Sequence, residues 1–191
     1  MCDMRNPIKG LVQDLKALRR FRLDNAAMAR AVRNVARRMV IAKDAWLHPS
    51  MCSGGPGAAA GIHPLHEEPD HSLAIFVVTW APGDETPPHD HGTWAVIAGL
   101  AGRETNHWWK RHDDATTPHH VDVRRAGADR IEPGTIISMD GDAIHSLHND
   151  SGAVSTTLHL YGHNVDFTDR RKYDPELGTI APYRLGLNLR A

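Results

Sequence analysis

The sequence of 191 residues has little cysteine, few aromatic side chains and no excess of either charge. Its two cysteines, Cys2 and Cys52, are too few and too badly placed for a disulfide framework or a thiolate metal site. The formal net charge of −1 argues against a dedicated nucleic-acid-binding protein, because phosphate neutralisation needs a basic excess. No apolar run approaches the ~20 residues of a membrane span, and the N-terminus has no apolar core of a signal peptide. We expect a cytoplasmic protein with neither nucleic-acid nor membrane partners.

Histidine is the residue present in excess. The chain has 14 histidines, all of them between His48 and His163. Histidine is the commonest metal ligand in proteins and a frequent acid–base group. A metal site is therefore the first hypothesis to test against the spacing of these residues.

Two kinds of periodicity divide the chain. From Ile8 to Leu47, apolar residues recur at helical spacing with Asp24 as a candidate N-cap, which predicts two helices with solvated basic faces. After a Gly-rich stretch, short β-branched runs separated by Gly, Pro and Asp predict strands over 73–80, 94–100, 105–109, 121–125, 135–139 and 154–161.

We expect a single, mainly β domain over 1–191, in which helices cover an antiparallel barrel. Its predicted parts are a helical N-terminal cap (1–49), a loop-rich connector (50–71), a β-barrel core (72–165) and a C-terminal extension (166–191).

The segment 87–102 carries two histidines separated by one residue. If the chain is extended there, His89 and His91 point to the same face and can bind one ion. The segment 140–149 offers a third ligand, His145 or His148. These segments resemble the two sequence motifs of the cupin superfamily, whose second motif ends in H-x3-N, and His145 followed by Asn149 fits that ending. The resemblance covers about 72–165 and implies a cupin fold, a double-stranded β-helix, with His89, His91 and His145 as metal ligands.

Many cupins have a Glu ligand after the HxH pair, at the positions where this chain has Ala95 and Val96. A three-histidine set without a carboxylate is neutral and leaves up to three positions of an octahedral ion open. Such a set suits Fe(II) that holds both a substrate and O2. Zinc-dependent hydrolysis is the competing use of three histidines with an open position.

In the predicted strand 154–161, alternation puts Thr157, His159 and Tyr161 on one face and Leu158 and Leu160 on the other. The polar face is costly to bury unless its groups bond to one another or to a ligand. This row is either a satisfied structural network or part of a site.

With the HDHGTW stretch, the polar row resembles the thiol dioxygenases, the family of type I cysteine dioxygenase and bacterial 3-mercaptopropionate dioxygenase. These iron(II) cupins add both atoms of O2 to a substrate thiol and give a sulfinate. The resemblance implies one Fe(II) per chain and a catalytic relay of Thr157, His159 and Tyr161, with Thr157 in place of the usual Ser. Val96 stands where animal cysteine dioxygenases have a cysteine crosslinked to the relay tyrosine, so the bacterial branch is the better match.

The same resemblance implies how a substrate is held. Arg170 lies nine residues after Tyr161, at the offset of the carboxylate-binding Arg of the mercaptopropionate branch, and Arg171 is the nearby alternative. The stretch 61–68 lacks the further Arg or Gln of the known branches, which leaves His66 or His63 as a substrate contact or as ordinary loop residues.

The implied substrates are O2 and a small thiol carboxylate, foremost 3-mercaptopropionate, with cysteine or mercaptosuccinate as alternatives. A further alternative is a non-catalytic metal-binding cupin, or a cupin with another metal-dependent activity. Homo-oligomerisation is compatible with each of these.

Overall fold

The computed structural model describes residues 7–52 and 61–184, so Cys2 lies outside the described residues. Two helices come first, α1 (Pro7–Arg19) and α2 (Asn25–Ile41), followed by two 3-10 turns, Lys43–Ala45 and Pro49–Cys52. A third such turn, Val165–Phe167, follows the eighth strand. The strands are β1 (Gly61–Glu67), β2 (Ala74–Trp80), β3 (Ala95–Ala101), β4 (Glu104–Arg111), β5 (Val123–Ile131), β6 (Ile136–Met139), β7 (Ile144–His148), β8 (Ser155–Tyr161), β9 (Arg171–Asp174) and β10 (Thr179–Pro182).

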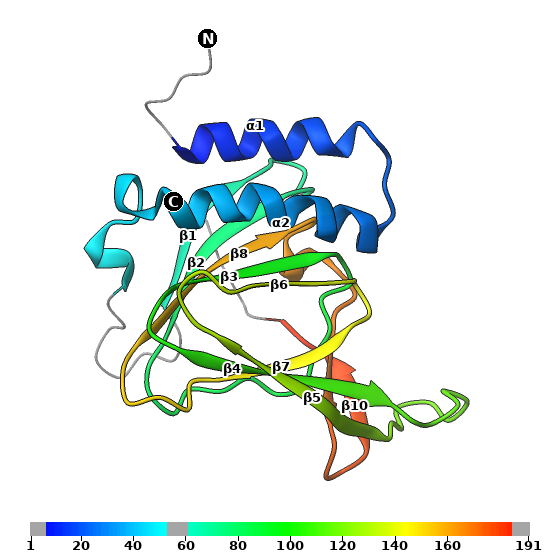
Figure 1. Ribbon diagram of the computed structural model, residues 1–191. Helices are drawn as coiled ribbons and strands as arrows, with labels where there is room; N and C mark the ends of the chain where they lie inside the picture. Colours follow the sequence, from blue (N-terminus) through cyan, green and yellow to red (C-terminus); the bar gives the residue numbers. More distant parts are fainter. Residues whose placement is uncertain (1–6, 53–60, 185–191) are drawn as a thin grey trace.

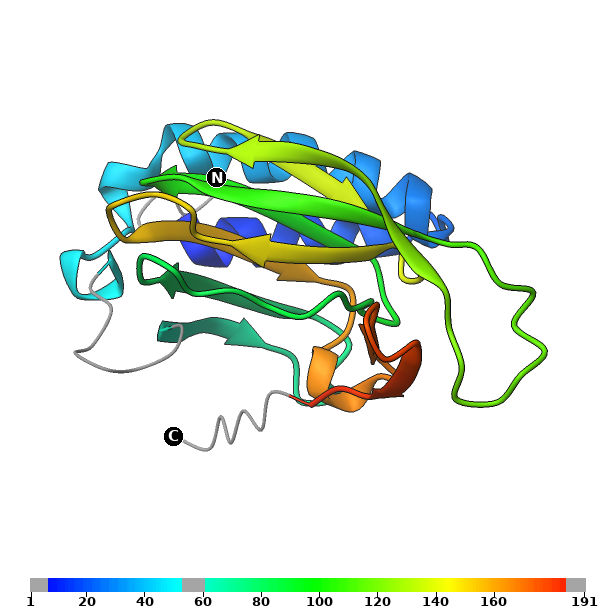
Figure 2. The same cartoon turned by 90° about the horizontal axis from the view of Figure 1, so that it is seen from below.

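Two antiparallel sheets face each other and form the barrel (Figure 1). The larger has the strand order β1-β2-β8-β3-β6, and the smaller has the order β5-β4-β7. The hairpin of β9 and β10 lies at one end of the barrel, as the view from below shows (Figure 2). The predicted fold class, mainly β with N-terminal helices, is confirmed.

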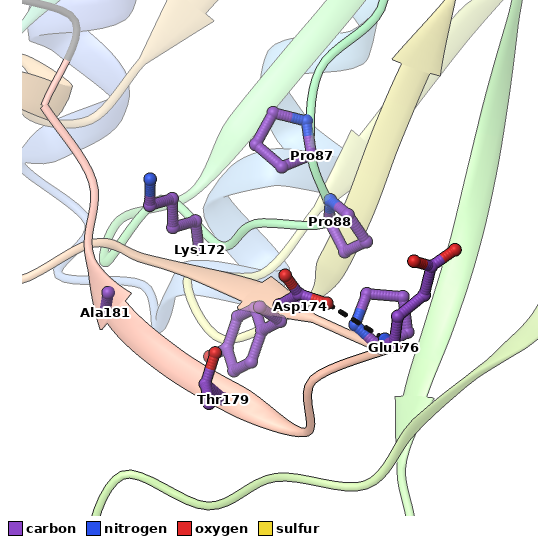
Figure 3. A pocket seen from close by; sticks show the side chains of 9 residues that line it. Pro87, Pro88, Lys172, Asp174, Glu176, Thr179 and Ala181 are labelled. Atoms are coloured by element: carbon purple, nitrogen blue, oxygen red, sulfur yellow. Dashed lines mark hydrogen bonds between the residues drawn. The ribbon is translucent and has the colours of Figure 1, made fainter.

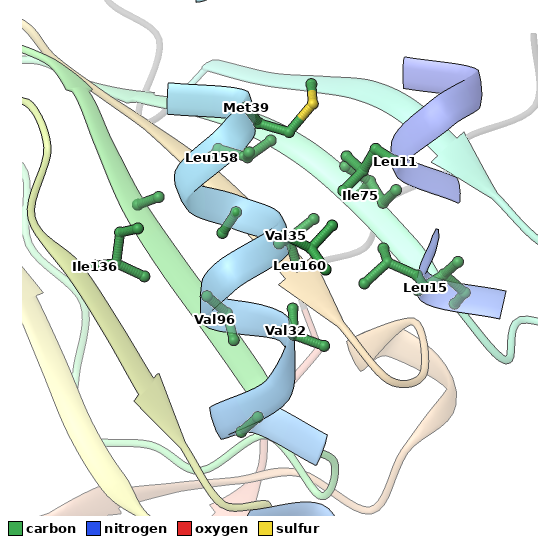
Figure 4. Packing of buried hydrophobic residues seen from close by; sticks show 14 of the residues in the cluster. Leu11, Leu15, Val32, Val35, Met39, Ile75, Val96, Ile136, Leu158 and Leu160 are labelled. Carbon is green, nitrogen blue, oxygen red and sulfur yellow. The ribbon is translucent and has the colours of Figure 1, made fainter. Parts of the chain in front are cut away.

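The two helices cover the outer face of the larger sheet. Side chains of α2, among them Val32, Val35 and Met39, pack against the outward side chains of β3 and β8, and α1 lies beside them (Figure 4). As predicted, Asp24 caps α2, since its side chain accepts a hydrogen bond of 2.7 Å from the Ala27 backbone N–H. In the described ranges, neither helix is long and apolar enough to cross a membrane.

Strands β2, β3 and β8 are buried on both faces, which explains their nearly continuous apolar runs. On β8, Leu158 and Leu160 face the helices, whereas Tyr161 belongs to the cluster inside the barrel. The parity expected for this strand is therefore observed, and the interior of the barrel carries its polar row.

The prediction that 50–71 is a loop-rich connector needs correction, because it contains β1. This strand pairs with β2 and has a bulge between Pro64 and His66. The strand was not predicted because Pro64 and two histidines interrupt the apolar pattern of GIHPLHE. Proline also lacks the backbone N–H that donates a hydrogen bond to a neighbouring strand. The sheet accommodates proline here because β1 is an edge strand. The extension after 165 likewise holds two strands, β9 and β10.

Candidate metal centre

Three histidines meet inside the barrel. His89 and His91 lie in the segment between β2 and β3, and His145 lies on β7. His89 and His145 form a backbone bridge, with N–H to O distances of 2.8 and 2.9 Å, so the ladder itself places the two imidazoles together. One ligand atom from each of the three buried side chains lies within 4.8 Å of the others. A divalent ion can bind this group.

Hydrogen bonds orient two of the rings. His89 Nδ1 donates to the Pro87 carbonyl oxygen at 2.8 Å, and His145 Nδ1 donates to Asn106 Oδ1 at 2.7 Å. Because carbonyl oxygens only accept, both rings carry their proton on Nδ1 and present a lone pair on Nε2. His145 Nε2 lies 3.2 Å from His91 Nε2.

Burial keeps the three rings neutral. Desolvation lowers the pKa of His89 and His91 well below the ordinary value of 6.5, and neighbouring histidines and Arg170 lower it further. The same causes lower the pKa of His145 to about 3. His91 Nδ1 is also buried without a hydrogen-bond partner among the described residues. Neutral imidazole donors that face one another at this separation fit a first-row transition metal.

The polar row of β8 forms a continuous hydrogen-bonded chain. Thr157 Oγ1 lies 2.9 Å from His159 Nε2, and His159 Nδ1 lies 2.8 Å from the Tyr161 hydroxyl. Desolvation lowers the pKa of His159 to about 3 and raises the pKa of Tyr161 to about 12, so both are neutral near pH 7. The Tyr161 ring centroid is 5.1 Å from that of His91, which places the end of the chain beside the three histidines.

A cavity of about 210 Å³ joins these groups. Its wall combines the three histidines, His159 and Tyr161 with one guanidinium, that of Arg170. The other lining residues are Ile62, Val78, Trp80, Glu85, Thr86, Leu147 and Tyr183.

Arg170 is 3% exposed and has a free edge. Its Nε donates to the Asp90 carbonyl oxygen at 3.3 Å, and its guanidinium carbon lies 4.4 Å from the Tyr183 ring centroid. Nη1 is buried and has no hydrogen-bond partner in the described part of the chain. A buried guanidinium with an unused N–H can donate a charge-assisted hydrogen bond to an anionic group such as a carboxylate.

The structure places the alternative residues from the sequence differently relative to the cavity. The Arg171 side chain is exposed and does not line the cavity, whereas Arg170 does. His66 bonds to Glu68 at 2.7 Å, and neither it nor His63 lines the cavity, so the structure gives no support to a substrate contact there. His148 also lies outside the cavity, and His145 takes the third place among the grouped histidines.

No thiol lies beside Tyr161 in the sheet. Ala95 is its partner on β3, while Val96 points to the opposite face and packs in the cluster below the helices. Val96 is therefore not the β3 residue that lies beside Tyr161. Ala95, which does lie beside it, has no thiol and cannot form a crosslink.

Sequence reasoning missed three residues of the site. Asn106 orients His145, Tyr183 stacks on Arg170, and the ring centroid of Trp108 lies 6.2 Å from that of His145. Asn106 and Trp108 are separated by one residue on β4, so they share the face toward the barrel interior. An asparagine within a predicted strand was a signal that Asn106 could bond to another side chain. Its partner, His145, could not be identified without knowing that β4 and β7 are neighbours.

No protein-family model matches the chain. Among solved structures it is similar to an oxalate oxidase in complex with glycolate, with 13% identity and a TM-score of 0.44. That match covers 59% of this chain and 56% of the oxalate oxidase, so the chain matches little more than half of that protein. A protein with a cupin-like fold from Ralstonia eutropha JMP134 has 16% identity and a TM-score of 0.44, covering 69% of this chain and 68% of that one.

A cupin domain of an XRE family transcriptional regulator from Enterobacter cloacae has 19% identity and a TM-score of 0.39. The match covers 55% of this chain and 96% of that domain. With TM-scores below 0.5, these similarities carry no conclusion about the chemistry of the site, which rests on its own geometry. The chain is a mainly β protein with N-terminal helices and antiparallel sheets, and its three buried histidines form a group able to bind a metal ion.

Proposed function

We propose that the protein is an Fe(II)-dependent thiol dioxygenase that oxidises a small mercaptocarboxylate, foremost 3-mercaptopropionate, to a sulfinate. In this reaction RSH and O2 give RSO2H: both oxygen atoms bond to sulfur, which loses four electrons to the O2. One observation carries the proposal. Three neutral histidines, a hydrogen-bonded tyrosine and a buried guanidinium with a free N–H converge on one cavity of about 210 Å³.

The three histidines supply the metal ligands in this proposal. His89, His91 and His145 would hold the ion without adding negative charge, so they would leave the site electropositive toward a substrate thiolate. When bound, iron supplies the redox chemistry that lets a thiol react with O2. The protein supplies orientation, through the bonds from His89 and His145 to Pro87 and Asn106.

Arg170 supplies recognition of the carboxylate. Its unpaired Nη1 offers a charge-assisted hydrogen bond at the wall of the same cavity that the histidines line. The wall of the cavity also carries the apolar side chains of Ile62, Val78 and Leu147. This distribution suits a short alkyl chain with a thiol at one end and a carboxylate at the other.

Tyr161 supplies a held proton. When His159 donates from Nδ1 to the phenol oxygen and accepts from Thr157 at Nε2, the phenol proton is free to point into the cavity. The raised pKa of Tyr161 keeps that proton in place near pH 7. The hydroxyl can therefore donate a hydrogen bond to an oxygen atom in the cavity and transfer a proton during turnover.

The cavity also bears on the alternative substrates. Mercaptosuccinate carries two carboxylates, but Arg170 is the one Lys or Arg among the described lining residues. Cysteine carries an ammonium group, for which the exposed carboxylate of Glu85 at the wall is the available partner. We therefore place 3-mercaptopropionate first and cysteine second.

A thiol panel tests the proposal. Iron-loaded protein is given 3-mercaptopropionate, cysteine, mercaptosuccinate or cysteamine, and O2 consumption and sulfinate are measured together. We expect one sulfinate per O2, the highest kcat/KM with 3-mercaptopropionate and the lowest with cysteamine, which has no carboxylate. His89→Ala is the control, because it removes a ligand and should abolish both iron content and turnover. If the protein binds metal but consumes no O2 with any of these thiols, it is a non-catalytic metal-binding cupin and the proposal is wrong.

A further inference from the structure

Asp90, the residue between the first two metal-ligand candidates, is bonded entirely to the segment that carries Arg170. Its backbone N–H donates to the Arg171 carbonyl oxygen at 3.1 Å, and its own carbonyl oxygen accepts from Arg170 Nε at 3.3 Å. Its carboxylate accepts from the Arg171 backbone N–H at Oδ1, at 2.8 Å, and from the Tyr173 hydroxyl at Oδ2, at 2.5 Å. Each of its four polar groups therefore holds the segment 170–173.

The residues around Asp90 add to this attachment. The Tyr173 backbone N–H donates to the Pro88 carbonyl oxygen at 2.8 Å, and Thr168 Oγ1 donates to the His91 carbonyl oxygen at 2.7 Å. Gly92, with a φ of 65°, turns the chain directly afterwards, and a Cβ there would lie only 3.0 Å from Thr168 Cβ. The histidine segment and the arginine segment are thus packed and bonded together as one body.

The burial of this junction makes the attachment rigid. Asp90, Arg170 and Tyr173 are all less than 9% exposed. Breaking a hydrogen bond there leaves a buried polar group unpaired, which costs more than breaking one in water. The outer side of the hairpin differs, since the Lys172 side chain is exposed and lines a separate surface pocket with Pro87 and Pro88 (Figure 3).

We propose that Asp90 determines substrate specificity by setting the distance between the metal ligands and the Arg170 guanidinium. The inference rests on the proposed function, in which the thiol binds at the histidines and the carboxylate binds at Arg170. His89 and His91 are covalently joined to Asp90, and Arg170 is held by it, so one residue links both ends of the substrate site. A fixed separation selects one length of carbon chain between thiol and carboxylate.

The experiment measures binding without turnover. Calorimetry under anaerobic conditions gives the affinities of mercaptoacetate, 3-mercaptopropionate and 4-mercaptobutyrate for the metal-loaded protein, with ethanethiol as a thiol that has no carboxylate. We expect the wild-type protein to prefer one length. We expect Asp90→Ala, which removes both hydrogen bonds of the carboxylate, to reduce that preference roughly tenfold or more, with metal content and ethanethiol affinity unchanged.

Two control variants test whether the effect of Asp90→Ala comes from the lost hydrogen bonds, rather than from the lost charge or from general damage to the β9–β10 hairpin. Asp90→Asn keeps an acceptor for the Arg171 N–H and a polar group for Tyr173, so it should retain the length preference. Lys172→Ala changes an exposed side chain of the same strand and should also retain it. If Asp90→Ala does not fold, Tyr173→Phe replaces it, because this variant removes only the bond to Oδ2 and should weaken the preference in the same direction.

The outcomes distinguish this inference from the proposed function. A folded, metal-loaded Asp90→Ala or Tyr173→Phe protein with the wild-type length preference would overturn the role of Asp90, whatever its activity. A length preference that responds to Asp90 in a protein without O2 uptake would support the role of Asp90 and refute the dioxygenase. A wild-type protein that binds the three carboxylates no better than ethanethiol would overturn the inference.

Discussion

At the residue scale, hydrogen-bond partners distinguish the histidines of the cavity from one another. His159 has a protein partner at each ring nitrogen, so neither nitrogen is free to bind a metal. His89 and His145 donate from Nδ1 to a carbonyl oxygen, and their Nε2 atoms face the other histidines of the group, with His145 Nε2 3.2 Å from His91 Nε2. All four histidines, including His91, are neutral because they are buried, but only three present a lone pair to a common point.

Asn106 is the residue outside the three histidines on which metal affinity should depend. It accepts the Nδ1 proton of His145 in a buried site, and removal of such an outer partner typically lowers metal affinity 10–100-fold. We expect Asn106→Ala to show a loss in that range, measured by competition with a chelator. Thr105→Ala, at the neighbouring position and bonded to Asp150, should bind metal like the wild type. Equal affinities in the two variants would contradict this role.

Tyr161→Phe should separate proton supply from metal binding. The variant removes the hydroxyl at the end of the β8 chain, and general acid–base groups typically contribute roughly 10²–10⁴-fold to rate. We expect kcat with 3-mercaptopropionate to fall within that range, while iron content stays at the wild-type level. Thr157→Ser keeps the hydroxyl next to His159 and is the matched control. An unchanged kcat in Tyr161→Phe would show that the row is structural only.

The sequence predicted those residues of the site whose positions follow from local spacing. Alternation on 154–161 put Thr157, His159 and Tyr161 on one face before any neighbour was known. Asn106 and Tyr183 could not be predicted, because their partners are distant in sequence. Asn106 bonds to His145 on the neighbouring strand β7, and Tyr183 packs against Arg170. That Arg170 lines the cavity and Arg171 does not likewise depends on the path of the chain after β8.

At the element scale, β8 explains how one strand serves two environments. Its even-numbered leucines lie under α2, and its odd-numbered polar residues line the interior. The sequence predicted this strand and both helices well, since each has a clear period. It failed for β1, where proline interrupts the pattern at an edge, and for β9 and β10, which are only four residues each.

The cap of α2 gives a stability prediction for the helical layer. Asp24→Ala removes the side-chain acceptor of the Ala27 N–H, a change that typically costs about 1 kcal/mol. We expect the free energy of unfolding in urea to fall by that amount, with the metal affinity of the folded protein unchanged. Asp24→Ser, which restores a capping oxygen, should recover most of the loss. Equal stability of Asp24→Ala and wild type would show that tertiary packing alone fixes the start of α2.

At the scale of the whole molecule, a second buried carboxyl makes stability depend on pH. Glu104 lies inside the barrel at 1% exposure and accepts a hydrogen bond of 2.7 Å from Ser155. Burial raises its pKa from 4.5 to about 7. Because the folded protein holds this proton more tightly than the unfolded chain, the group disfavours folding increasingly as pH rises from about 4.5 to 7.

Glu104→Gln should remove that dependence. A pKa difference of this size corresponds to about 3 kcal/mol. We expect the stability of the variant relative to wild type to rise by that amount between pH 4.5 and pH 8, measured by urea unfolding at each pH. The buried histidines have the opposite effect, because their lowered pKa values destabilise the folded protein at acid pH. Both proteins contain these histidines, so their contribution cancels in the difference in stability between the variant and the wild type. Parallel stability curves would mean that Glu104 is ionised in the folded protein.

The indole of Trp108, with its ring centroid 6.2 Å from that of His145, has a practical consequence. An ion with unpaired electrons quenches the fluorescence of an aromatic group at such short range, whereas a closed-shell ion such as Zn²⁺ does so far less. Emission from this side chain should therefore report which ion occupies the barrel and how fast it enters, with no attached dye. Replacing Trp108 with phenylalanine would leave the other indoles as the background against which that signal is read.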